Sequence, residues 1–275
     1  MIVSFCKFIY RSDNLLKAWL KLFVELTGNN YVSQLLVRFT SSTWSRMLVP
    51  IFAKVYRINQ EEMEKSLSEY QSLHQLFTRK LKFGCRSIES QPNCLVSPVD
   101  GVISDFGFVQ DVEKYPIKNK QIRLEEMLGS KEKANVYRNG KYIILYLSPR
   151  HYHRIHSPVD GIIKESWVLG EKSYPVNSIG LKYGNSPLST NYRRITEIQS
   201  ELGNIAVVKV GALNVNSVHL TARSDKLGRG EELAYFSFGS TVVLFIERAT
   251  FQFSPDIAGN NDISFGKSVG VFSNA

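Results

Sequence analysis

Histidines are concentrated in one short stretch of the chain. Three of the five lie within six residues, at His151, His153 and His156, in the segment SPRHYHRIHSP. Histidine is the side chain whose ordinary pKa lies closest to neutral pH, so this cluster indicates either proton transfer or metal binding. A metal would need further ligands at a suitable spacing, and neither an HxxxH helix pattern nor a cysteine pair supplies them. Acid–base chemistry is therefore the favoured interpretation, and a histidine-bound metal remains as the alternative.

A serine near the C-terminus is a second candidate for chemistry. Ser240 follows Gly239 and precedes the apolar run Val242–Phe245. A serine hydroxyl in such a turn acts as a nucleophile when a histidine and a carboxylate reach it in space. The G-x-S-x-G elbow of the α/β-hydrolases is absent, so an ordinary serine hydrolase fits poorly. The structural alternative is a plain turn that leads into a strand.

The pentapeptide SPVDG occurs twice, at Ser97–Gly101 and Ser157–Gly161, and each copy precedes two β-branched residues. Proline is tolerated at the start of a strand, and Asp-Gly forms a tight turn. Each copy alone therefore predicts a turn that leads into a strand, and the pair predicts two similar β-units. Whether Asp100 or Asp160 also does chemistry is left open by the motif.

The elements that must position these candidates follow from the pattern around them. From about residue 91, β-branched and aromatic runs alternate with turn residues, as in KYIILYLSP, GNIAVVKVGALNV and GSTVVLFIE. We therefore expect an α+β fold. A mainly antiparallel β domain, hybrid-barrel or sandwich-like and with two similar β-units, spans residues 91–275, and an N-terminal helical region, residues 1–90, precedes it.

The N-terminal region carries apolar side chains at helical spacing with basic residues among them. Asn59 and Glu62 resemble a capping pair and predict a further short helix. The net charge of +9 favours a polyanionic partner, either nucleic acid or an anionic membrane surface. Two interpretations of the helices stay open, packing on the β domain or lying in a membrane interface. No apolar run approaches the ~18–20 residues of a spanning helix.

Three motifs in a fixed order carry a resemblance to a known family. SPVDG with Asp100, YHRIH at Tyr152–His156 and FGST at Phe238–Thr241 resemble the bacterial, pyruvoyl-dependent phosphatidylserine decarboxylase proenzyme family. The segments SLHQLFTRKLKFGCRSI, YPVN, VGALNVNS and GEELAYFSFGSTVVLFIE fit the same family. The resemblance covers roughly residues 60–250, whereas residues 1–58 match only as variable amphipathic helices. Local departures leave the Asp, His and Ser motifs intact, and they occur at Phe238, Tyr192, Asn216 and Ala234.

The resemblance implies a self-processing enzyme that converts phosphatidylserine to phosphatidylethanolamine and CO₂ in phospholipid biosynthesis. Ser240 attacks the carbonyl of Gly239, and the chain is cut into a β chain, residues 1–239, and an α chain, residues 240–275. Ser240 then becomes a covalent pyruvoyl group that forms the Schiff base with the substrate amine. This carbonyl replaces an external cofactor, so neither pyridoxal phosphate nor a metal is expected.

The same resemblance assigns roles to individual residues. His156 is the base that activates Ser240, and Asp100 is the carboxylate that orients this base, as in a serine triad. His153 is the proton donor in decarboxylation. The second SPVDG is then a structural copy, with Asp160 as turn former.

A lipid substrate gives the basic charge and the amphipathic N-terminal region a purpose. The expected partners are phosphatidylserine, an anionic membrane surface, and the α and β chains of one proenzyme; a homodimer is left open and nucleic acid is not expected. The expected location is peripheral, on the cytoplasmic face of the cell membrane. Two alternatives remain, a non-catalytic membrane-binding β-domain or hybrid-barrel carrier with an uncut turn, and a histidine-metal hydrolase.

Overall fold

The computed structural model describes most of the chain, in the ranges 30–109, 115–117, 120–177, 181, 183, 185–212, 217–237 and 239–273. The first part of the expected helical region, residues 1–29, lies outside these ranges. So do Phe238 of the FGST motif and the departure at Asn216.

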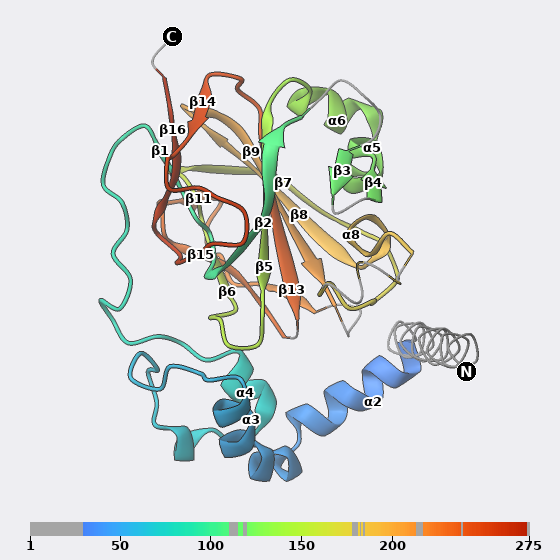
Figure 1. Cartoon of the computed structure of the whole chain (residues 1–275), viewed down its shortest axis with the longest axis vertical. Coiled ribbons are helices and arrows are strands. Elements are labelled where there is room, and N and C mark those ends of the chain that lie inside the picture. The colour runs from blue at the N-terminus through green and yellow to red at the C-terminus, as the bar shows by residue number, and fades with distance from the viewer. Residues whose placement is uncertain are drawn as a thin grey trace, which may run out of the picture.

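One large antiparallel sheet forms the centre of the molecule (Figure 1). Its strands, in spatial order, are β11 (Lys226–Leu227), β7 (Gly161–Leu169), β8 (Arg193–Ser200), β9 (Gly203–Gly211), β13 (Ser240–Ile246), β5 (Lys141–Leu147), β2 (Gly101–Phe108) and β15 (Asp262–Ile263). In the described part of the chain this sheet ends at β11 and β15 rather than closing. The architecture is therefore a set of open sheets and not a closed barrel.

Both faces of the large sheet are covered, which explains why its central strands are mostly apolar. Successive side chains of a strand point to opposite faces. In β13, Val242 and Leu244 belong to one buried cluster, and Val243 and Phe245 to the other. The second cluster is covered by three short helices that the sequence analysis did not predict, α5 (Leu124–Leu128), α6 (Lys131–Tyr137) and α8 (Pro187–Thr190).

Two three-stranded antiparallel sheets cover the first cluster, and they have the same construction. One has the order β1 (Cys94–Val96), β16 (Ser268–Phe272), β14 (Phe251–Phe253). The other has the order β6 (Arg154–His156), β12 (Glu232–Phe236), β10 (Val218–Leu220). A short hairpin, β3 (Tyr115–Ile117) with β4 (Lys120–Ile122), completes the strands.

The two SPVDG copies occupy equivalent places in these two units. The glycine of each copy is the first residue of a strand, β2 or β7, and each strand carries an irregularity in its pairing two to four residues later. Asp100 Oδ1 accepts a hydrogen bond from the Phe265 amide, and Asp160 Oδ1 accepts one from the Arg229 amide, both at 2.8 Å. The prediction of an α+β fold with two similar β-units is confirmed.

The helical elements of the N-terminal region lie together at one end of the sheets (Figure 1). They are α2 (Asn30–Ser41), η1 (Thr43–Leu48), α3 (Val49–Val55), η2 (Leu67–Glu69) and α4 (Leu73–Phe77). The helix predicted after Asn59 is wrong: Asn59 Oδ1 accepts the Glu61 amide at 3.1 Å in a local turn, and the capping box forms at Ser66 and Glu69 instead. None of the described helices is long and apolar enough to cross a bilayer.

Candidate active site

The histidine segment runs from the end of β5 into β6, alongside β12. His156 lies opposite Glu232 in the β6–β12 pairing. His153, just before β6, accepts a hydrogen bond from the Phe236 amide on its own carbonyl oxygen, at 3.0 Å. The two histidines therefore lie at opposite ends of β12, and His153 is beside the end that continues toward Ser240.

His153 is completely buried, with one ring nitrogen bonded and the other without a partner. Its Nδ1 lies 2.9 Å from the His151 carbonyl oxygen, which can only accept, so Nδ1 carries the proton. Its Nε2 has no hydrogen-bond partner among the described residues. The Phe77 ring packs against the imidazole with 3.8 Å between centroids. Burial, and then the positive charge of Arg79, hold the pKa of His153 well below its ordinary value, so the ring is a neutral base at neutral pH.

His156 has the same tautomer in a different setting. Its Nδ1 lies 2.8 Å from the Gly230 carbonyl oxygen, and its Nε2 lies 3.2 Å from the Tyr152 hydroxyl, which donates to it. The Phe265 ring stacks on the imidazole with 3.8 Å between centroids and 12° between planes. Burial lowers the pKa of His156, so this ring is also neutral with its lone pair on Nε2.

Asp100 is buried and held by an arginine. Arg86 donates Nε to Asp100 Oδ1 at 3.1 Å and Nη2 to Oδ2 at 2.6 Å, and the same Nη2 reaches Glu62 at 2.8 Å. Such two-pronged charged pairs are strong and geometrically specific. Among the described residues, no hydrogen bond joins Asp100 to His156.

Asp100 and His156 are nevertheless neighbours. The His156 amide donates to the Pro98 carbonyl at 2.9 Å, two residues before Asp100. Phe265 connects the two side chains, because its amide binds Asp100 while its ring stacks on His156. Asp100 also lines a cavity of about 360 Å³ together with Tyr152, whose hydroxyl binds His156.

The aspartate of the second SPVDG copy has a different environment. Asp160 is exposed, and its carboxylate accepts the Arg229 amide. Asp100 is only 6% exposed and carries the Arg86 pair. The two copies are therefore equivalent in backbone and unequal in chemistry.

Ser240 is the first residue of β13, in the middle of the large sheet. It lies opposite Leu147 of β5 and Gly211 of β9. Its Oγ is buried and has no hydrogen-bond partner among the described residues. Among the described residues, chain neighbours aside, a Cβ at Gly239 would meet only the Ala212 Cβ, at an ordinary contact distance of 3.9 Å. Ser240 thus presents a buried hydroxyl that makes no hydrogen bond with the described residues, next to the peptide bond that joins it to Gly239.

A second unengaged hydroxyl lies close to Ser240. A Cβ at Gly211 would come within 1.9 Å of Ser217 Oγ, so this hydroxyl packs over the residue opposite Ser240. Ser217 Oγ is also buried without a partner among the described residues. No pattern in the sequence distinguishes Ser217 from an ordinary serine.

The pairing of the histidine segment with β12 shows how each histidine lies relative to Ser240. Ser240 follows Phe236, the neighbour of His153, by four residues, which span at most about 14 Å. It follows Glu232, the neighbour of His156, by eight. In the uncut chain His153 therefore lies beside the end of β12 that is nearer to Ser240, and His156 lies beside the other end, near Asp100.

The histidine cluster does not converge as metal ligands would. His151 accepts the Ser148 amide on Nδ1 at 3.0 Å, while His153 and His156 bind separate carbonyl oxygens. Within the described ranges, no three His, Cys, Asp or Glu side chains are grouped for a metal ion.

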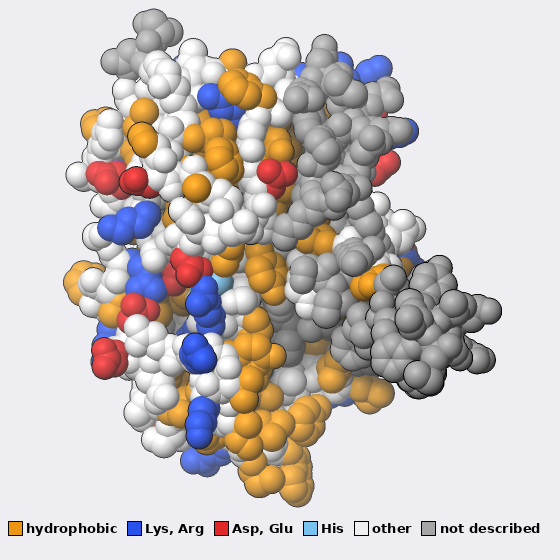
Figure 2. Space-filling model, in the orientation of Figure 1, with side chains coloured by type: hydrophobic (Ala, Val, Ile, Leu, Met, Phe, Trp, Pro, Cys, Tyr) orange, Lys and Arg blue, Asp and Glu red, His pale blue; other side chains and the backbone are white. Residues whose placement is uncertain are grey.

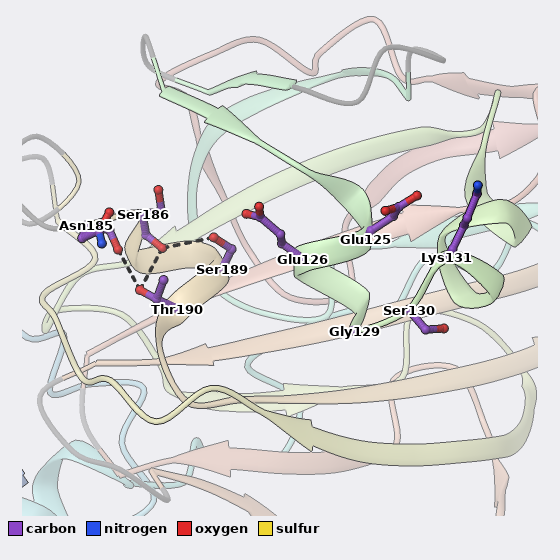
Figure 3. Close-up of a pocket in the computed structure, with 9 residues that line it drawn as sticks. All are labelled: Glu125, Glu126, Gly129, Ser130, Lys131, Asn185, Ser186, Ser189 and Thr190. Atoms are coloured by element: carbon purple, nitrogen blue, oxygen red, sulfur yellow. Dashed lines mark hydrogen bonds between the residues drawn. The ribbon is translucent and has the colours of Figure 1, made fainter.

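A separate cavity of about 690 Å³ lies between α5 and α8 (Figure 3). Glu125, Glu126 and Lys131 line it with several hydroxyl side chains, and Thr190 Oγ1 donates to the Asn185 carbonyl at 2.8 Å. It contains none of the predicted site residues.

Sequence reasoning missed the residues that hold the site. Arg79 belongs to the basic run TRKLK at Thr78–Lys82, and Arg86 follows it; basic side chains of this kind ordinarily face solvent. Both are instead turned into the protein, where they bind the histidine segment and Asp100. Only their alternation with apolar residues in TRKLKFGCR hinted at a partly buried segment.

Comparisons with known proteins agree on one family. A family model described as phosphatidylserine decarboxylase matches residues 73–271. A phosphatidylserine decarboxylase proenzyme from Anoxybacillus flavithermus is 51% identical over 253 residues, which cover 92% of this chain and 96% of the relative. Proteins of the same name are 50% identical in Geobacillus sp. (92% of this chain, 98% of the relative) and 52% identical in Halalkalibacterium halodurans (86% and 91%).

Proposed function

The chain belongs to the phosphatidylserine decarboxylase family, and from this premise we propose that it cuts itself at Gly239–Ser240 and converts phosphatidylserine to phosphatidylethanolamine and CO₂. The observation that carries the proposal is the Oγ of Ser240, which is buried and has no hydrogen-bond partner in the described part of the chain. Leaving a buried hydroxyl unsatisfied costs about 1–3 kcal/mol, and such groups call for an explanation such as catalysis.

Self-cleavage needs a base, an electrophile and an orienting anion. Ser240 Oγ bonds to the Gly239 carbonyl carbon as the Gly239–Ser240 C–N bond breaks, which leaves an ester and a free amine. Loss of the Ser240 α-proton then expels the Gly239 carboxylate. Water then hydrolyses the dehydrated residue 240, so that its nitrogen leaves as ammonia and an oxygen takes its place as the pyruvoyl keto group.

We assign the first proton transfer to Nε2 of His156, supported by its lone pair on that atom. Tyr152 now occupies this nitrogen, so its hydroxyl must rotate away or relay the proton. Asp100 acts on His156 through Phe265 and through its negative charge, which favours the protonated imidazole.

The residues present fit a pyruvoyl group at position 240. The strand pairings on both sides of β13 hold the residue in place, and Gly239 before it carries no side chain. When formed, the group supplies the carbonyl that accepts the electron pair released as CO₂ departs. His153 is neutral, and its Nε2 has no hydrogen-bond partner among the described residues, so it accepts the proton of the substrate ammonium and returns it to the substrate carbon.

Exposed apolar side chains on the N-terminal helices support a substrate that lies in a membrane. Large hydrophobic side chains are exposed along the helices from α2 to α3, and Figure 2 shows them gathered at the end of the molecule formed by these helices. The most exposed are Leu35, Trp44, Met47, Ile51 and Val55, and Trp44 and Met47 are 77% and 76% exposed. Basic residues accompany them, at Arg38, Arg46, Lys54 and Arg57.

This combination suits an interfacial helix on an anionic leaflet. Phe77, at the end of α4, packs on His153, so the helices lie at the histidine end of the sheets. We therefore place the membrane contact within residues 1–90 and the enzyme peripherally on the cytoplasmic face.

Ser240→Ala removes the nucleophile and should leave one uncut chain without decarboxylase activity. Intact-mass measurement of the wild-type protein should give two pieces, residues 1–239 and 240–275. Thr241→Ala, one position further along β13, is the matched control and should cut normally. A wild-type chain that remains whole while decarboxylating phosphatidylserine would sink the proposal.

Separate substitutions should separate the two histidines. His156→Ala should accumulate uncut. His153→Ala should cut, but its kcat should fall by roughly 10²–10⁴-fold, the usual contribution of a general acid or base. His219→Ala, in β10, serves as the control. If His153→Ala is the uncut variant and His156→Ala is cut, the base is His153, which lies beside the end of β12 that leads to Ser240.

The two SPVDG aspartates should respond differently to the same change. Asp100→Asn keeps the shape but removes the charge that faces Arg86 and His156; the corresponding change in a serine triad costs about 10⁴-fold. Asp160→Asn retains an oxygen for the Arg229 amide, so its stability should change by less than about 1 kcal/mol. The fraction of cut chain over time measures both. Normal cutting by Asp100→Asn with a stalled Asp160→Asn would reverse the assignment.

Membrane docking should depend on the exposed apolar helices. The triple variant Trp44→Ser, Met47→Ser, Ile51→Ser should lose roughly tenfold to a hundredfold in vesicle binding per side chain, since burying one contributes about 1.5–3 kcal/mol. The matched control changes three exposed apolar residues of the β-strands, Ile162, Val168 and Leu220, to Ser. Equal flotation of both variants with phosphatidylserine-containing vesicles would place the contact elsewhere in the chain.

A further inference from the structure

Arg79 is a buried arginine at the junction of α4 and the histidine segment. It is 4% exposed. Its Nη2 donates to the carbonyl oxygens of Arg150 at 2.7 Å and His151 at 2.8 Å, and its Nη1 donates to the Leu76 carbonyl at 3.3 Å. Burial lowers the pKa of Arg79 to about 10, so it stays charged at neutral pH. A buried charge is tolerated only when it is hydrogen-bonded, and here backbone carbonyls serve that purpose.

One of these carbonyls is shared with a proposed catalytic base. The His151 oxygen accepts from Arg79 Nη2 at 2.8 Å and from His153 Nδ1 at 2.9 Å. A carbonyl oxygen has two lone pairs, so both bonds form together. The direction in which this carbonyl points decides which nitrogen of His153 carries the proton. A guanidinium that fixes the carbonyl therefore fixes the tautomer.

The same chain segment also fixes the ring plane. Phe77 lies two residues before Arg79, and its ring packs against His153. His153 is thus held on its face by Phe77 and at Nδ1 by the His151 carbonyl, which leaves Nε2 as the one nitrogen without a partner in the described part of the site.

We propose that Arg79 is a positioning residue for His153, fixing the His151 carbonyl so that His153 keeps its proton on Nδ1 and presents Nε2 to the reaction. The proposal rests on the proposed function for the catalytic use of His153, and on the geometry alone for the tautomer. Because Arg79 follows α4, it also ties the proposed membrane-binding helices to the position of this base.

The charge of Arg79 adds an electrostatic effect. Arg79 and His151 are the charged or titratable groups that act on His153, and burial adds to their effect. Removing the positive charge raises the pKa of His153. If activity requires neutral His153, the pH at which activity rises should therefore be higher without the charge of Arg79.

Nitrogen-15 NMR of the histidine rings tests the tautomer in the uncut Ser240→Ala chain, where no catalysis is needed. With Arg79 present, His153 should show a protonated Nδ1 and a bare Nε2. Arg79→Gln should mix the two tautomers and raise the pH at which His153 titrates. Arg79→Lys keeps the charge, so its tautomer mixture should lie between those of the wild type and Arg79→Gln. If Arg79→Gln does not fold, Arg79→Lys is compared with the wild type in its place.

Arg154→Gln is the matched control. Arg154 also donates to a backbone carbonyl, that of Thr78, at 3.2 and 3.1 Å, and does not bind His151. Its His153 tautomer should stay unchanged. An unaltered His153 spectrum in folded Arg79→Gln or Arg79→Lys would overturn the proposal.

Kinetics of the cut enzyme distinguish this proposal from the proposed function. Arg79→Lys should lower kcat by about tenfold to a hundredfold with little change in KM, since misplacing a catalytic group costs up to about 10². The midpoint of the pH profile of Arg79→Lys should lie closer to the wild-type midpoint than that of Arg79→Gln, because lysine keeps the positive charge. A wild-type protein without decarboxylase activity would defeat the proposed function, whereas the NMR comparison would still decide the role of Arg79.

Discussion

Reciprocal backbone hydrogen bonds between the two SPVDG turns are the constraint on which the site depends. The His156 amide donates to the Pro98 carbonyl at 2.9 Å, and the Val96 amide donates to the Pro158 carbonyl at 3.0 Å. Each turn is therefore anchored to the strand that leads into the other. This crossing brings Asp100, from one β-unit, beside His156, from the other, although they are far apart in the chain.

A symmetric scaffold becomes a site only where its two halves differ. The position equivalent to His156 in the other unit is Val96, and the position equivalent to Phe265 is Arg229. Only one half therefore has an imidazole with an aromatic ring to stack on. Of the two aspartates, Asp100 forms the ion pair with the partly buried Arg86, whereas Asp160 is exposed and accepts the Arg229 amide. The repeated backbone places the two turns side by side, and the residues that differ between the two units provide the reactive groups.

Local patterns in the sequence predicted the α+β class and the two β-units, because alternation and turn residues act over a few neighbours. The strands expected at KYIILYL and STVVLFI are present as β5 and β13. The roles of Arg79 and Arg86 could not be predicted in this way. Arg79 contacts a carbonyl 71 residues away, and its charge alone suggests solvent or a membrane. Likewise, α5 and α6 are helices of only five and seven residues, and their apolar residues have partners only on the sheet they cover.

The place of the proposed cut explains how a chain could lose a peptide bond and keep its fold. The residues before it belong to β12, which pairs with β6 and β10 in a three-stranded sheet. The residues after it belong to β13, which pairs with β5 and β9 along seven residues on each side. β12 ends at Phe236 and β13 begins at Ser240, so the described pairings of both strands lie outside the connection that would be cut. Breaking it frees a new terminus at residue 240 while the neighbouring strands hold that residue in the centre of the large sheet, so the group made there would stay fixed relative to the histidines that must serve it.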